Sequence, residues 1–269
     1  MFEPQFRSQR NGVPILSDAE IDEHAELFIT DYDKTLLTDP RPIDIEHFAE
    51  YYLGLQQEYN NLTHCGLILG RMVFNDAEIP VYDAEAKRAE YASVKAGTIL
   101  IDNTLLEEKT EYRLRSTVGH ECGHWIYHAG YFYVDPFQMT LFQDETKVST
   151  ACRTTDIEGG KKQLATPLDW VEHHAKYFSA AILMPKQAVL MVANNPSLRK
   201  AVREECNGYK EDDLLASVIA ETFNVSPASA KIRIKQLGVS MEDEYKRVQQ
   251  QSIFYMQSGI QAFKEKHPV

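Results

Sequence analysis

The feature that most constrains this chain is the stretch TVGHECGHWIYHAG at residues 117–130, in which three histidines recur at every fourth position. On an α-helix, residues four positions apart lie on one face, so His120, His124 and His128 would form a ladder. The residues around them are largely apolar, which favours a helix packed into a core over a solvated one. Because a buried helix has little structural use for so many imidazoles, the pattern indicates a metal site.

The segment HECGH fits the pattern His-Glu-x-x-His. On a helix, His120 and His124 lie one turn apart and can bind one Zn²⁺, while Glu121 projects beside them as a general base. This combination of residue types is suited to metal-assisted hydrolysis, in which the glutamate takes a proton from water.

A catalytic zinc site uses three protein ligands and keeps one position open. His128 is a poor third ligand, because eight residues of helix place it about 12 Å from His120. Cys122 follows His120 by two positions and points to a nearly opposite face. We therefore interpret His128 as a satisfied or surface imidazole and Cys122 as a small core residue.

The third ligand is expected from another element. The candidates downstream that carry a nitrogen, oxygen or sulfur donor are Glu172, His173, His174, Asp144, Glu145 and Cys152. Glu172 lies next to the apolar face of a helix predicted over residues 168–185, which makes it the leading choice among several. We interpret Cys152 as an ordinary thiol. Tyr127, Tyr131, Tyr133 and His128 remain open as donors that could stabilise an oxyanion.

The stretches RSTVGHECGHWIYH and WVEHHAKYFSAAILMP together resemble the ImmA/IrrE family of zinc metallopeptidases. That family pairs His-Glu-x-x-His with a later Glu-x-x-Ala-x-x-Phe helix that ends in Leu-Met-Pro. Glu172, Ala175 and Phe178 match the second motif, and residues 182–185 match its ending. The likeness covers roughly residues 64–238.

The resemblance implies a third metal ligand, a fold and an activity. It makes Glu172 the third zinc ligand and the fold a zincin-like metallopeptidase core of α+β class. The implied activity is that of a zinc-dependent endopeptidase, and the implied substrate is a helix-turn-helix repressor that controls mobile-element or stress-response genes.

The remaining pattern predicts an α+β fold in which helices predominate. Helices are expected at residues 17–32, 43–59, 104–129, 168–185, 186–206, 211–223 and 227–237, and strands at 64–74, 78–83 and 97–102. Residues 131–167 read as a long loop with little regular structure. The strand at 97–102 precedes the HECGH helix, and it is either an edge to which a peptide substrate adds or a buried central strand.

These elements predict four regions. They are an N-terminal helical region at 1–62, the metallopeptidase core at 63–205, a helix-turn-helix-like region at 206–240 and a tail at 241–269.

Charge argues against a nucleic-acid binder. The chain has 28 basic and 40 acidic residues and a net charge of −12, whereas phosphate binding needs clustered cations. The second helix of the helix-turn-helix-like region carries Lys231, Arg233 and Lys235, which keeps one alternative open. In that alternative the protein is a non-catalytic regulator that sequesters its partner or contacts DNA through this region.

The chain has no run of roughly 18 apolar residues, so we expect no membrane span. Its N-terminal residues lack the pattern of a signal peptide, and its four cysteines have no paired spacing. We therefore expect a cytoplasmic protein with reduced thiols.

Overall fold

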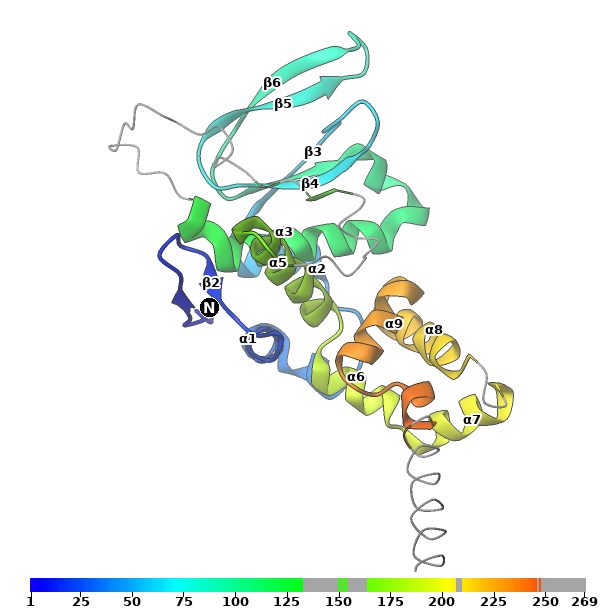
Figure 1. The fold of residues 1–269 in the computed structure, drawn as a ribbon. Coiled ribbons are helices and arrows are strands. Elements are labelled where there is room, and N and C mark those ends of the chain that lie inside the picture. Colours follow the sequence, from blue (N-terminus) through cyan, green and yellow to red (C-terminus); the bar gives the residue numbers. More distant parts are fainter. Residues whose placement is uncertain (133–149, 151, 154–163, 207–209, 246, 248–269) are drawn as a thin grey trace, which may run out of the picture.

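The computed structural model describes residues 1–132, 150, 152–153, 164–206, 210–245 and 247. The fold is mixed α+β, as expected from the sequence (Figure 1). Its central element is the long helix α3 (Glu111–Phe132), which contacts the sheet on one side and α5 (Pro167–Leu183) on the other.

The main sheet has the strand order β3-β7-β4-β8. Strand β7 (Thr98–Asp102) pairs parallel with β3 (Gln56–Asn60) and antiparallel with β4 (Ile68–Val73). The short strand β8 (Cys152–Arg153) pairs antiparallel with the other side of β4. All five residues of β7 are buried, so it is a central strand, and the alternative that it forms a peptide-binding edge is wrong.

A separate two-stranded ribbon of β5 (Ala77–Asp83) and β6 (Arg88–Val94) extends from the sheet, away from α3 in Figure 1. Strand β5 was expected from the sequence, whereas β6 was not. Strand β6 has the sequence RAEYASV, in which most side chains are exposed. It contains no apolar run that would mark it as a strand. A further small pair, β1 (Arg7–Ser8) and β2 (Pro14–Ile15), lies near the N-terminus.

Helix α1 (Asp18–Asp33) begins where the sequence predicted. The Ser17 hydroxyl accepts the Glu20 backbone N–H at 3.3 Å, and the Glu20 carboxylate accepts the Ser17 N–H at 2.8 Å. This reciprocal capping satisfies two backbone donors that the helix itself cannot. Helix α1 packs against α5 and thereby supports the helix that carries Glu172.

The helix expected over residues 43–59 is shorter than predicted. It consists of α2 (Ile45–His47) and one π-helical stretch, Phe48–Tyr52. Gly54 then adopts a left-handed conformation (φ +71°), which suits the end of a helix. Residues Gln56–Asn60 leave the helical path because their backbone pairs with β7, a partner about forty residues away that local periodicity cannot report.

Helix α3 is displaced toward the C-terminus from the expected span of 104–129. Two 3₁₀ turns, Asn103–Leu106 and Glu108–Thr110, precede it. Asp102 caps the first of these turns by accepting the Thr104 N–H at 3.0 Å. Gly130 does not end the helix, which continues for two further residues.

The C-terminal helices are α6 (Lys186–Ala193), α7 (Pro196–Cys206), α8 (Glu211–Phe223) and α9 (Pro227–Gln236). The predicted single helix at 186–206 is divided in two, because Asn195 caps α7 by accepting the backbone N–H of Ser197 at 3.0 Å. The predicted spans of α8 and α9 are confirmed, and α5 ends before Pro185 as expected.

Most of the predicted loop at 131–167 and most of the tail at 241–269 lie outside the described residues. Of that loop, Cys152–Arg153 forms β8, so this part is more regular than predicted. Among the described helices, none combines the length and the apolar character that crossing a membrane requires.

Candidate metal centre

The close contact between α3 and α5 depends on two glycines that flank the histidines. A Cβ atom on Gly123 would lie 2.9 Å from the Ala175 Cα, and one on Gly119 would lie 2.9 Å from the Ser179 Oγ. Side chains larger than hydrogen at these positions would force the helices apart. The glycines therefore let α5 approach closely enough to bring Glu172 to the histidine face of α3.

His120, His124 and Glu172 converge on one point. The two Nε2 atoms of the histidines are 2.9 Å apart. The Glu172 carboxylate oxygens lie 3.3 Å from the Nε2 of His120 and 3.5 Å from that of His124. His124 is fully buried, whereas the Glu172 side chain is 32% exposed and forms the solvent side of the group.

This donor set fits a zinc ion. Tetrahedral coordination at about 2.0–2.1 Å places neighbouring ligand atoms about 3.3 Å apart, close to the observed distances. Two imidazoles and a carboxylate are ligand types that zinc prefers in catalytic sites. Burial holds the pKa of His124 well below its ordinary value, so its ring is neutral and has a lone pair for a metal.

Glu121 lies beside these donors with its side chain fully buried between α3 and β4. Its Oε2 accepts a hydrogen bond from the Thr150 hydroxyl at 3.4 Å, and its Oε1 has no hydrogen-bond partner among the described residues. Burial is the main cause that raises the pKa of Glu121 to about 8, and the nearby Glu172 carboxylate contributes to this rise. A carboxylate with one oxygen held and one unoccupied is arranged to exchange a proton.

Gly70 on β4 makes the room that Glu121 occupies. A Cβ atom at this position would lie 2.4 Å from the Thr117 Cγ2 and 3.0 Å from the Glu121 Oε1. Nothing in the sequence around Gly70 indicates this role, because the contact joins a strand to a helix about fifty residues away.

The other third-ligand candidates lie elsewhere. His173 pairs with Asp18 of α1 at 2.7 Å and is in neither donor group found among the described residues. His174 stacks on His128 and is not part of either donor group found among the described residues. Asp144 and Glu145 lie outside the described residues.

Cys152 is closer to the site than its interpretation as an ordinary thiol suggested. It forms a second group with His120 and Glu121, in which the donor atoms all lie within 4.8 Å of one another. It reaches this position through β8, whose pairing with β4 places Cys152 opposite Gly70. The sequence motif gives no sign of this non-local contact.

His128 and Cys122 are both buried, and both lie outside the group of His120, His124 and Glu172. The interpretation of Cys122 as a core residue is confirmed, and burial raises the pKa of its thiol. The interpretation of His128 is incomplete, because its Nδ1 lies 3.1 Å from the Nδ1 of His124. The four-residue spacing of the histidine ladder was the sequence signal for that contact.

Of the tyrosines considered as oxyanion donors, Tyr127 is buried and its hydroxyl contacts the Nδ1 of His24 at 3.2 Å. That contact occupies its polar end in the core, away from the metal donors. Tyr133 lies outside the described residues.

Two of the three basic residues considered for DNA contact in the helix-turn-helix-like region form ion pairs within the protein. Arg233 is fully buried and forms an ion pair with Asp22, which is also buried. Lys231 forms an ion pair with Asp213 of α8. Lys235, the third of these residues, is exposed.

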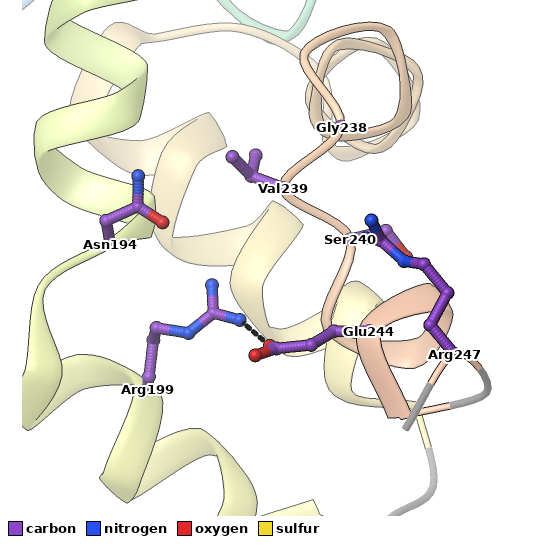
Figure 2. A pocket seen from close by; sticks show the side chains of 7 residues that line it. All are labelled: Asn194, Arg199, Gly238, Val239, Ser240, Glu244 and Arg247. Atoms are coloured by element: carbon purple, nitrogen blue, oxygen red, sulfur yellow. Dashed lines mark hydrogen bonds and ion pairs between the residues drawn. The ribbon is translucent and has the colours of Figure 1, made fainter. Parts of the chain in front are cut away.

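A hollow lies near the end of α9, far along the chain from the candidate metal donors. Figure 2 shows the residues that line it, which are Asn194, Arg199, Gly238, Val239, Ser240, Glu244 and Arg247. Arg199 points toward Glu244 and is ion-paired with it, and Arg203 donates to the same carboxylate at 3.2 Å. Because the Glu244 carboxylate, which lines the same hollow, neutralises Arg199, the hollow does not present Arg199 to an anion.

A scan against protein-family models found no match, and a search of curated proteins found no significant relative.

Proposed function

We propose that this protein is a zinc-dependent endopeptidase, and that its substrate is a helix-turn-helix repressor, as the motif resemblance implies. The observation that carries the proposal is the convergence of three metal donors from two helices beside a buried glutamate. A purely structural zinc site would close all four positions with ligands and would have no use for Glu121.

His120, His124 and Glu172 would hold the zinc ion. When bound, zinc polarises a peptide carbonyl and lowers the pKa of water toward neutrality. The partly exposed Glu172 side chain marks the direction from which a substrate reaches the donors, because both histidines lie deeper in the protein.

Glu121 would act as the general base. Its Oε1 is available to accept a proton from water, and the Thr150 hydroxyl orients the other oxygen of the carboxylate. After the water attacks the peptide carbonyl carbon, Glu121 would return the proton to the leaving amine.

The C-terminal helical region would dock the substrate protein rather than DNA. The burial of Arg233 and the pairing of Lys231 remove two of the three cations on which DNA contact would depend. The non-catalytic alternative differs in its need for Glu121, because a sequestering protein would bind its partner without this residue.

The test compares the wild-type protein with Glu121→Gln in the presence of zinc and helix-turn-helix repressors encoded nearby. Glutamine keeps the shape of the side chain but cannot accept the proton, so cleavage should fall by about 10²–10⁴-fold. Discrete fragments are detected by mass spectrometry, and the zinc content of both proteins is measured. Glu107→Gln, an exposed position just before α3, is the matched control and should cleave normally.

Cleavage that persists undiminished in Glu121→Gln would remove the assigned mechanism. Tight repressor binding by the zinc-loaded wild type without any fragment would favour the sequestering alternative.

A further inference from the structure

His128, the third histidine of the repeat on α3, has no part in the mechanism proposed above. His128 is fully buried on α3, one turn beyond His124. Its Nδ1 lies 3.1 Å from the Nδ1 of His124, which is within hydrogen-bond distance. A buried imidazole in contact with a metal donor requires an account of which nitrogen carries each hydrogen.

The metal donors settle that assignment. A neutral imidazole has one N–H and one lone pair. The Nε2 of His124 faces the Nε2 of His120 and the Glu172 carboxylate, so a metal there requires its lone pair on Nε2. The hydrogen of His124 is then on Nδ1. Since Nδ1 of His124 donates, the neighbouring Nδ1 of His128 must accept, and the hydrogen of His128 is on Nε2.

We propose that His128 is a positioning residue for the metal centre, which accepts the hydrogen bond from the Nδ1–H of His124 and thereby aims the Nε2 lone pair of His124 at zinc. This inference rests on the metal site of the proposed function, but it does not depend on peptidase activity. Metal-binding histidines commonly donate their second N–H to a carboxylate or a carbonyl, and here another imidazole fills that place.

The surroundings of His128 agree with a fixed ring of one tautomer. The ring of His174 on α5 stacks on it, with the centroids 5.7 Å apart and the planes at 12°. This stacking favours the observed plane of the His128 ring, in which its Nδ1 faces His124. The Nε2 of His128 has no hydrogen-bond partner within the described residues. An unmatched buried N–H is unfavourable, so a ring that served for packing alone would be better replaced by an apolar one.

Zinc affinity, measured by competition with a chelator, tests the proposal. His128→Phe keeps an aromatic ring against His174 but removes the acceptor, so affinity should fall by about 10–100-fold, as for other residues that orient a metal ligand. His128→Asn keeps an acceptor near the Nδ1 position and should recover part of that loss.

His24→Phe is the matched control. His24 is also a buried histidine with a hydrogen bond to α3, through Tyr127, but it touches no metal donor. Its substitution should leave zinc affinity unchanged even if it lowers the melting temperature. An unchanged affinity in His128→Phe would overturn the proposal, as would an equal loss in His24→Phe.

A measurement on the wild-type protein keeps the inference testable if the variants do not fold. Nitrogen-15 NMR of the zinc-loaded protein should show His124 protonated at Nδ1 and His128 protonated at Nε2. A hydrogen on Nδ1 of His128 would overturn the proposal. If the wild type binds no zinc at all, the metal centre of the proposed function fails with it, whereas normal zinc binding with the other tautomer removes the inference alone.

Discussion

Two buried polar clusters in this protein are built in opposite ways. The first joins α1, α5 and α9, where Arg233 donates from Nε to the Met184 carbonyl at 3.1 Å and forms an ion pair with Asp22. The other oxygen of Asp22 accepts the Tyr177 hydroxyl at 3.0 Å. Each charge in this cluster is met by an opposite charge or a hydrogen-bond partner. Because the cluster connects three helices, we refer to it as the interhelical joint.

The second cluster is the candidate metal centre, where the nitrogen and oxygen atoms of three side chains converge on one point. The Nε2 atoms of His120 and His124 meet at 2.9 Å, and the Oε1 of Glu121 has no partner among the described residues. Buried polar groups in native proteins are normally satisfied, so the exceptions require an explanation. The difference teaches that a buried charge met by an opposite charge indicates a structural role, whereas ligand atoms that converge beside a carboxylate oxygen with no partner among the described residues indicate a candidate site of chemistry.

The largest expected effect is on the interhelical joint. Arg233→Met would leave the Asp22 carboxylate buried without its cation, which should lower the free energy of unfolding by about 3–5 kcal/mol. Urea denaturation of the metal-free protein measures this loss in the free energy of unfolding. Lys231→Met, which breaks a largely exposed ion pair on the same helix, is the control and should stay close to wild type. Equal stability of the two variants would break the comparison.

A substitution in the candidate metal centre should lower zinc affinity and leave the stability of the metal-free protein nearly unchanged. Glu172→Ala removes a ligand, so zinc affinity should fall by more than the roughly 10–100-fold that loss of a ligand's supporting contact produces. Metal-free stability should change by less than about 0.5 kcal/mol, because this side chain is partly exposed. Metal content and urea denaturation measure the two effects. His173→Ala, the neighbouring position on α5, should bind zinc normally, and zinc retained at wild-type affinity in Glu172→Ala would exclude it as a ligand.

Gly70→Ala sharpens the comparison by disturbing only Glu121 and its neighbour Thr117. The added methyl group would clash with both, so we expect stability to fall by about 1–3 kcal/mol and cleavage to fall with it. Zinc should be retained, because no ligand is displaced. Gly130→Ala, with open space around the new methyl group, should gain roughly 0.5–1 kcal/mol instead. A Gly70→Ala protein that cleaves normally would contradict the assigned position of Glu121.

The smallest expected effect concerns the cysteines. The four cysteines, all of which are among the described residues, form no disulfide. A Cys122→Ala/Cys152→Ala double variant should bind zinc with wild-type affinity, because three other donors supply the site. Titration of the unfolded wild type should find four reactive thiols. Loss of zinc from a folded double variant would make Cys152 a ligand and extend the metal centre to β8.

The parts of the site that lie on single helices could be predicted from the sequence. The spacing of His120, Glu121 and His124 fixes their common face, and the span of α5 follows from its apolar repeat and Pro185. These are local regularities, in which each residue's position depends on neighbours within one or two turns.

The rest depends on contacts between distant segments. Residues Gln56–Asn60 became a strand because β7 pairs with them, and β7 is central because β3 and β4 flank it. Cys152 reaches Glu121 only through its pairing with β4. The choice of Glu172 from several candidates needed the resemblance. The position of Glu172 on its own helix does not show that this helix packs against the helix that carries the histidines.

The interhelical joint also has a consequence for the order in which the protein is made. Asp22 leaves the ribosome well before its partner Arg233, which follows 211 residues later. During that interval the carboxylate has no cation to accompany it into the core, so α1 cannot settle fully against α5. A nascent chain arrested before α9 should therefore expose α1 to protease, and it should become resistant only when α9 has emerged.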